Sequence, residues 1–77
     1  MEWMPLADSR CEYIESEILQ LEAEVFQDKK KFLVRGFVRG RELFSKSYLR
    51  KSAAKKRAED WLKNEVIHAM NELQKLI

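Results

Sequence analysis

Apolar residues in the first third of the chain recur at intervals of three and four positions. The series consists of Cys11, Ile14, Ile18, Leu21 and Val25. Such spacing places apolar side chains on one face of an α-helix, and Ser9 with Glu12 three residues later fits the capping box that begins a helix. The pattern predicts an acidic amphipathic helix over residues 9–24, after an apolar lead-in over residues 1–8 that we expect to pack on the domain.

The middle of the chain alternates between apolar and polar residues, which is the period of a strand. The alternation extends over residues 31–38 and 42–49, after a short first strand. Between them, Arg39 and Gly40 are expected to form a two-residue hairpin turn, because glycine accepts a positive φ without strain. The pattern predicts a three-stranded antiparallel sheet over residues 24–49.

The hairpin turn also predicts which residues of the two longer strands face each other, with Phe37 opposite Glu42 and Arg35 opposite Phe44. In this register the face expected against the helices carries Phe32, Val34, Val38, Leu43 and Leu49. The face expected to meet solvent or a partner carries Leu33, Arg35, Phe37, Phe44, Lys46 and Tyr48. Large nonpolar side chains on that second face form a candidate partner interface, consisting of Leu33, Phe37, Phe44 and Tyr48.

A second apolar series predicts a long helix over residues 51–76. At 1.5 Å per residue this helix extends about 36 Å, which is more than short strands can cover. Its C-terminal turns are therefore expected to pack on the lead-in, on the first helix or on another copy of the chain. The predicted fold is one α+β domain over residues 1–77, in the order α-β-β-β-α, with both helices on one face of the three-stranded antiparallel sheet.

The net charge of +2 is distributed unevenly. Residues 1–28 carry a charge of −7, residues 29–57 carry +11 and residues 58–77 carry −2. A central block this cationic is typical of a surface that binds a polyanion. Several of the cations begin the last helix, where the helix dipole already favours an anion. The candidate binding residues are Lys29, Lys30, Lys31, Arg50, Lys51, Lys55, Lys56 and Arg57.

Residues 32–58 resemble the second half of a double-stranded RNA-binding domain. That family has a Phe-x-Val strand, a Gly-Lys or Gly-Arg hairpin, and a helix that opens with Lys-Lys-x-Ala-Lys-x-x-Ala. Gly40-Arg41 occupies the place of the hairpin, and the matching helix positions are Lys51, Ala54, Lys55 and Ala58. The resemblance implies shape-directed binding of double-stranded RNA, in which Lys51 and Lys55 hold phosphates across the major groove.

Two other functions fit the same residues. The candidate partner interface and the long last helix fit a protein-interaction or dimerisation module, which would act as a regulator or inhibitor by binding a second copy or another protein. A DNA-binding three-stranded sheet, similar to the arm-binding domains of integrases, would place Arg35, Arg39 and Lys46 in the major groove.

The sequence gives no indication of catalysis. It has no evident grouping of histidine, carboxylate and nucleophile, no glycine-rich phosphate loop and no metal-ligand spacing. We therefore expect neither an enzyme nor a cofactor, metal or small-molecule substrate. Cys11 is the single cysteine, which excludes an internal disulfide and favours an intracellular (cytoplasmic) location. No stretch is long and apolar enough to cross a membrane, so no membrane partner is expected.

Overall fold

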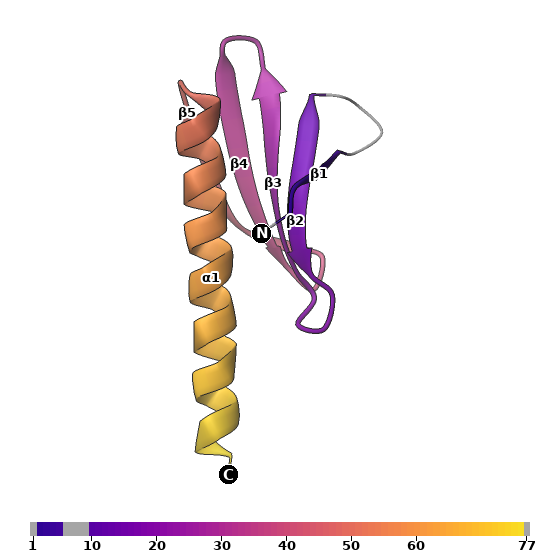
Figure 1. Ribbon diagram of the computed structural model, residues 1–77, viewed down its shortest axis with the longest axis vertical. Helices are drawn as coiled ribbons and strands as arrows, with labels where there is room; N and C mark the ends of the chain where they lie inside the picture. The colour runs from indigo at the N-terminus through magenta and orange to yellow at the C-terminus, as the bar shows by residue number, and fades with distance from the viewer. Residues whose placement is uncertain (1, 6–9, 77) are drawn as a thin grey trace.

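Five strands precede one long helix in the computed structural model, which describes residues 2–5 and 10–76 (Figure 1). The elements are β1 (Met4–Pro5), β2 (Cys11–Ser16), β3 (Leu21–Asp28), β4 (Lys31–Val38), β5 (Arg41–Tyr48) and α1 (Lys51–Lys75). The strands pair antiparallel in sequence order and form one sheet. The helix lies on one face of this sheet, against β3 and β4, and its C-terminal half extends past the sheet (Figure 1).

The predicted order α-β-β-β-α is wrong, because the segment expected to be the first helix forms strands β2 and β3. The two strands are joined by a turn in which Gln20 has a φ of 55°. Ile18, which was expected on the buried helical stripe, lies in this turn and is 95% exposed. The expected helix cap at Ser9 lies outside the described residues. Three strands and two helices are therefore replaced by five strands and one helix in the part of the chain that is described.

The pairing of β3 with β4 explains why this segment is extended. Apolar and acidic residues alternate along the first part of β3, and its apolar members face the apolar members of β4. The opposed pairs are Leu21 with Val38, Ala23 with Gly36, and Val25 with Val34. A slip of one residue would turn the glutamates of β3 toward the core, so this register is strongly favoured. Burial along a whole strand outweighs the small intrinsic helix preference of glutamate, leucine and alanine.

The hydrophobic core lies between this face of the sheet and the first half of α1. Ile14 and Val34 are the largest fully buried side chains on the sheet, while Ala54 and Ala58 let the helix approach it closely. Trp61 lies directly over Gly36, and a Cβ atom built at that glycine would be 2.8 Å from the indole ring. Because that separation is far below van der Waals contact, glycine is required where the indole meets the sheet.

The hairpin between β4 and β5 was predicted correctly at its turn. Arg39 and Gly40 have φ values of 53° and 80°, as a type I′ turn requires, and Phe37 pairs with Glu42 as expected. The next pairs differ, because the register shifts beside Gly36 and Phe37. A bulge of this kind adds one unpaired residue to a strand.

The register shift corrects the predicted faces of β5. Gly36 lies opposite Phe44, and Phe32 lies opposite Tyr48, so both aromatic residues of β5 face the helix. Phe44 stacks on Trp61 with ring centroids 6.3 Å apart. Leu43, which was expected against the helices, is 57% exposed. The faces of β4 were predicted correctly and those of β5 were reversed.

The long helix was also predicted correctly, and it begins at Lys51. Its first half buries Ala54, Ala58, Trp61 and Leu62 against the sheet. Its second half extends past the sheet (Figure 1). The molecule is therefore elongated, with dimensions of 47, 22 and 21 Å. Within residues 2–5 and 10–76 there is no first helix for these turns to pack on, and Leu73 and Leu76 are 55% and 84% exposed.

Candidate nucleic-acid interface

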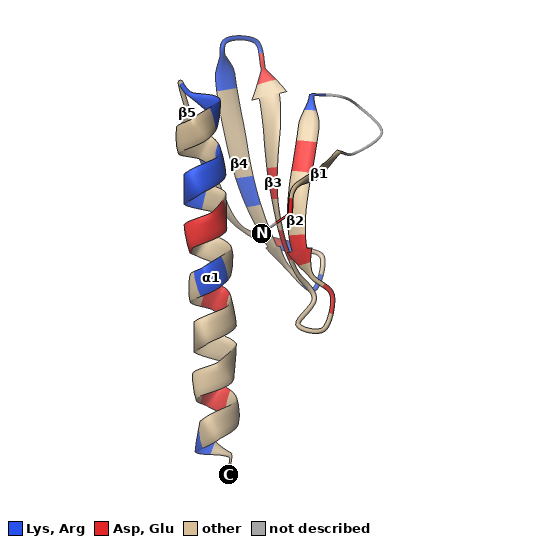
Figure 2. Cartoon of the chain, in the orientation of Figure 1, with Lys and Arg blue, Asp and Glu red and all other residues tan. Residues whose placement is uncertain are grey.

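Two basic segments that are far apart in the sequence lie at the same end of the sheet. Antiparallel pairing of β4 with β5 sets Phe32 opposite Tyr48, so the chain before Phe32, with Lys31, and the chain after Tyr48, with Arg50, leave the sheet at the same end. The turn before β4 and the start of α1 therefore share one end of the molecule, where Figure 2 shows the basic residues in blue.

Arg10 lies at this same end, although it was expected at the start of an acidic helix. Its carbonyl oxygen accepts a hydrogen bond of 2.9 Å from the backbone N–H of Gln27, which fixes the start of β2 beside the end of β3. Only the pairing of these two strands shows that Arg10 belongs with the other cations. We define the basic end by six residues, which are Arg10, Lys29, Lys30, Lys31, Arg50 and Lys51.

No capping side chain accepts a hydrogen bond from the backbone N–H groups in the first turn of α1. Arg50 occupies the N-cap position with extended backbone and makes no side-chain capping bond, and the first turn contains no acidic residue. Free N–H groups at a helix start, together with the helix dipole, favour an anion there. Lysine at this position opposes the dipole, so the helix start combines two sources of positive potential.

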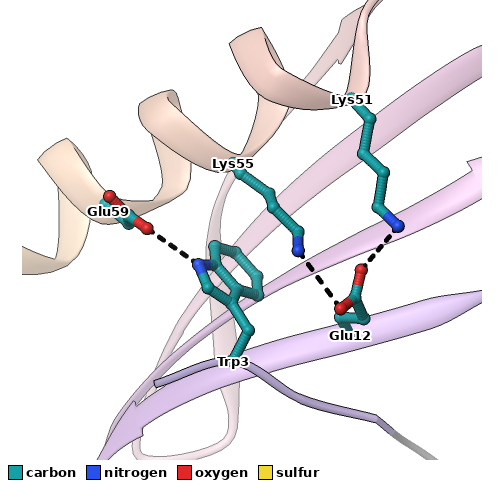
Figure 3. Close-up of polar contacts among 5 residues, drawn as sticks. All are labelled: Trp3, Glu12, Lys51, Lys55 and Glu59. Atoms are coloured by element: carbon teal, nitrogen blue, oxygen red, sulfur yellow. Dashed lines mark hydrogen bonds and ion pairs between the residues drawn. The ribbon is translucent and has the colours of Figure 1, made fainter. Parts of the chain in front are cut away.

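Lys51 and Lys55, the two expected phosphate-holding residues, share one carboxylate of the chain (Figure 3). Lys51 Nζ lies 2.8 Å from Glu12 Oε2, and Lys55 Nζ lies 3.1 Å from Glu12 Oε1. The hydrogen bond from Lys51 is the main cause that holds the pKa of Glu12 below its ordinary value, and Lys55 adds to it. Both ammonium groups are therefore already paired within the chain, and a phosphate would have to compete with Glu12 for them. Two cations on one carboxylate still leave a net positive charge.

Trp3 connects the short strand β1 to the helix beside this ion-pair cluster (Figure 3). Its indole N–H donates a hydrogen bond of 2.8 Å to Glu59 Oε1, and Lys55 Nζ lies 5.0 Å from the centre of the indole ring. The lead-in was expected to pack on the domain, and the described part of it does so through Trp3. The residues of the lead-in from 6 to 8 lie outside the described part.

The remaining candidate cations on α1 make weaker contacts. Lys56 Nζ lies 3.6 Å from Asp60 Oδ2 one turn later, and both side chains are largely exposed. Arg57 stacks over the ring of Phe44 at 4.4 Å from its centre. Exposed ion pairs contribute about 0.2–1 kcal/mol, so a phosphate group can replace Asp60 at little cost.

Lys29, Lys30, Lys31 and Arg50 are exposed, and within residues 2–5 and 10–76 none of them has a carboxylate in ion-pair range. Lys29 has a φ of 56°, which places it in the tight turn between β3 and β4. The charges of these four residues are therefore available to an external anion.

The face of the sheet opposite α1 is acidic on β2 and β3. Glu15 lies opposite Glu22, and Glu24 forms an ion pair with Arg35 of β4. Burial is the main cause that raises the pKa of Glu22, and the charges of Glu24 and Glu15 raise it further. This face, which we call the open face, would therefore repel a phosphate backbone.

The three cations expected to enter a DNA groove are not on one surface. Arg35 is on the open face and pairs with Glu24, while Lys46 lies opposite Val34 and so faces the helix side. Arg39 lies in the turn at the end of the sheet opposite the basic end. Their arrangement gives no continuous positive surface on the sheet.

The four residues of the candidate partner interface are divided between the two faces. Leu33 and Phe37 are half-buried on the open face, whereas Phe44 and Tyr48 pack toward α1. Cys11 is on the open face and only 6% exposed. The expected interface does not exist as one patch.

The described residues hold neither a metal-ligand cluster nor a helix that could cross a membrane. No group of three or more histidine, cysteine, aspartate or glutamate side chains could hold a metal ion there. The only helix in that part of the chain, α1, is too polar to cross a membrane. No known protein family, curated protein or solved structure matches the chain.

Proposed function

We propose that this protein is a non-enzymatic module that binds the phosphate backbone of a nucleic-acid duplex at the basic end. The observation that carries the proposal is the convergence of Lys29–Lys31 with Arg50 and Lys51, which pairing of β4 with β5 brings to one end. The uncapped start of α1 adds backbone donors to the same place. Phosphate oxygens are the groups that such donors and cations bind together.

The basic end contains no element suited to reading bases. It consists of a tight turn and the first turns of a helix, with lysine and arginine as its reaching side chains. Binding through such side chains depends on charge and backbone shape, and carries little sequence information. Duplex RNA is the ligand that the sequence resemblance implies, and duplex DNA of equal length is the comparison that separates shape from charge. The proposal also places the protein inside the cell, as expected from its single cysteine.

The test compares two double variants with the same change in charge. Lys30→Glu with Arg50→Glu removes two exposed cations from the basic end, whereas Arg41→Glu with Lys75→Glu removes two from the rest of the surface. Fluorescence anisotropy with a labelled duplex gives the dissociation constant at several salt concentrations. Each lost phosphate contact lowers the slope of log affinity against log salt by about 0.9.

We expect the basic-end variant to bind at least about tenfold more weakly and to lose about two units of salt slope, if both cations contact phosphates. The control variant should retain most of the affinity. Equal losses in the two variants would show that binding follows net charge alone, and would refute a site at the basic end. Binding that is unchanged in both would refute it as well.

A protein-interaction function is the second candidate, and one observation favours it. The projecting half of α1 exposes Ile67, Met70, Leu73 and Leu76 in a chain whose other large apolar residues are mostly packed. Contiguous exposed apolar surface of this kind is typical of a protein contact.

A further inference from the structure

Two arginine side chains lie over a phenylalanine ring, and their surroundings differ in one respect. Arg35 lies over Phe37, with its guanidinium carbon 5.7 Å from the ring centre, and it also forms an ion pair with Glu24. Arg57 lies over Phe44 at 4.4 Å, but it has no carboxylate in ion-pair range in the described part of the chain. A ring contacts the face of a guanidinium group and leaves the N–H groups of its edge to bind an anion. Arg57 is therefore held as Arg35 is, without the anion.

The two sides of the first half of α1 differ in the same way. On the side toward β2, Lys51 and Lys55 share the carboxylate of Glu12. On the side toward the edge strand β5, Arg57 has no such partner among the described residues. Glu42 is the single acidic residue of β5, and its pairing with β4 places it on the open face. An anion that approaches α1 thus meets free positive charge on the β5 side.

A second cation lies on this side of β5. Lys46 is opposite Val34 and so faces the helix side, two residues from Phe44 on the same strand. Two residues of a strand cover about 7 Å, so Lys46 is a close neighbour of the guanidinium group of Arg57. Lys46 Nζ lies 5.5 Å from the ring centre of Tyr48, and the side chain is exposed. Within the described residues it has no carboxylate in ion-pair range either.

These two cations are continuous with the basic end. Strand β5 ends at Tyr48 and α1 begins at Lys51, and the connection between them contains Arg50 of the basic end. From Arg50 to Arg57 the chain rises about 10 Å along α1. Each strand of a duplex carries one charge per about 3.4 Å of its axis, so a backbone held at the basic end reaches Arg57 within about three nucleotides.

We propose that Arg57 and Lys46 form a second phosphate site, the β5 site, and that the nucleic-acid backbone held at the basic end continues along the β5 side of α1. The inference rests on the proposed function, because the basic end supplies the first contacts. The edge of the Arg57 guanidinium group suits two oxygens of one phosphodiester, while Lys46 attracts a neighbouring phosphate as a point charge. The acidic open face opposes the other course, across the outer side of the sheet.

The test compares two double variants that lose the same charge from the same two elements. Lys46→Gln with Arg57→Gln removes the β5 site, whereas Arg41→Gln with Lys63→Gln is the control on β5 and α1. Anisotropy with one labelled RNA duplex gives the affinity and its salt dependence, and circular dichroism shows whether both variants stay folded. We expect the β5-site variant to bind at least about fivefold more weakly and to lose up to about two units of salt slope. The control should change little.

Arg57→Lys keeps a cation over the ring but loses the planar edge. It should keep the salt slope and bind about twofold to threefold more weakly, because lysine cannot hold one phosphate through two parallel bonds. Equal losses in the β5-site variant and its control would overturn the β5 site and leave the basic end standing, since Lys30→Glu with Arg50→Glu tests that end separately. A wild type that binds no duplex would overturn both.

Cross-linking tests the course of the backbone. Ser45 and Lys46 are adjacent on β5 but lie on opposite sides of the sheet, because Ser45 is opposite Arg35 and Lys46 is opposite Val34. A duplex with a thiol-reactive group, placed in turn on each backbone phosphate, should cross-link to Lys46→Cys and not to Ser45→Cys. The wild type gives the background from Cys11. Cross-linking at position 45 that equals or exceeds that at position 46 would overturn the proposal, and so would none at position 46 from any phosphate.

Discussion

Glu12→Gln should weaken the fold and strengthen nucleic-acid binding at the same time. The carboxylate holds Lys51 at 2.8 Å and Lys55 at 3.1 Å, and it joins β2 to the start of α1. These ion pairs are half-exposed, so each contributes about 0.2–1 kcal/mol. Their joint loss should therefore lower the free energy of unfolding by about 1 kcal/mol. For a chain of this size that change lowers Tm by about 4–8 °C.

The opposite effect on binding follows from the release of the two ammonium groups. In the wild type a phosphate must displace Glu12 to reach Lys51 or Lys55, and in the variant both are available at no such cost. We expect affinity for a duplex to rise about threefold to tenfold, which is about 0.7–1.4 kcal/mol. The salt slope should become steeper by up to about two units if both lysines contact phosphates.

The assay pairs thermal unfolding by circular dichroism with anisotropy titrations of one labelled duplex. Glu15→Gln is the control, because it gives the same change in net charge on the same strand but on the open face. Its Tm should stay level or rise, since Glu15 lies opposite Glu22. If Glu12→Gln binds no more tightly than Glu15→Gln, the lysines at the start of α1 do not contact the ligand and the reasoning fails.

Three further substitutions test the packing and the charges of the fold. Gly36→Val should destabilise by several kcal/mol, because the side chain would meet Trp61, and a urea midpoint near the wild type would contradict this contact. Trp3→Phe keeps an aromatic ring but loses the hydrogen bond to Glu59, so calorimetry should show a loss of about 1 kcal/mol. Glu22→Gln should raise Tm at neutral pH, because a pKa raised in the folded state means that stability falls as pH rises through the glutamate range. That gain should vanish in acid, where Glu22 is protonated, and a gain that is the same at every pH would contradict its cause.

The pKa of Glu12 gives stability the reverse dependence on pH. Because the pKa of this carboxyl is lowered in the folded protein, its contribution is present above the unfolded pKa and is lost as pH falls through the folded one. Acid unfolding of the wild type therefore includes a contribution that Glu12→Gln removes, and the difference in Tm between the two proteins should narrow toward low pH.

The parts of the fold that could be predicted from the sequence are those with local signals. Residues 31–38 alternate and are rich in β-branched and aromatic side chains, and Gly40 permits the hairpin turn. The long helix is marked by its apolar stripe. These features depend on residues a few positions apart, so the chain around them need not be known.

The error over β2 and β3 has a specific physical origin. Cys11 and Ile14 fit a helical spacing, but they lie on opposite faces of β2, and only Ile14 belongs to the main core. Leu21, Ala23 and Val25 fit a strand, and their pairing with β4 favours that alternative. The bulge in β5 was likewise missed, because it turns Phe44 toward Trp61, a residue far away in the sequence.

The basic residues of the candidate site could be predicted from the sequence, but the carboxylate that pairs with two of them could not. Charge alone marks Lys29–Lys31 and the start of α1, and antiparallel pairing then brings them together. Glu12 could not be identified as the partner of Lys51, because an acidic helix was expected where β2 lies. The position of Arg10 was missed for the same reason.

The most direct test of the central claim is a map of amide chemical shifts as duplex RNA is added to labelled protein. The account predicts that the largest changes fall at residues 29–31 and 50–57, at the turn before β4 and the first turns of α1. Changes confined to the open face of the sheet or to the C-terminal half of α1 would contradict it, and so would a spectrum that does not change.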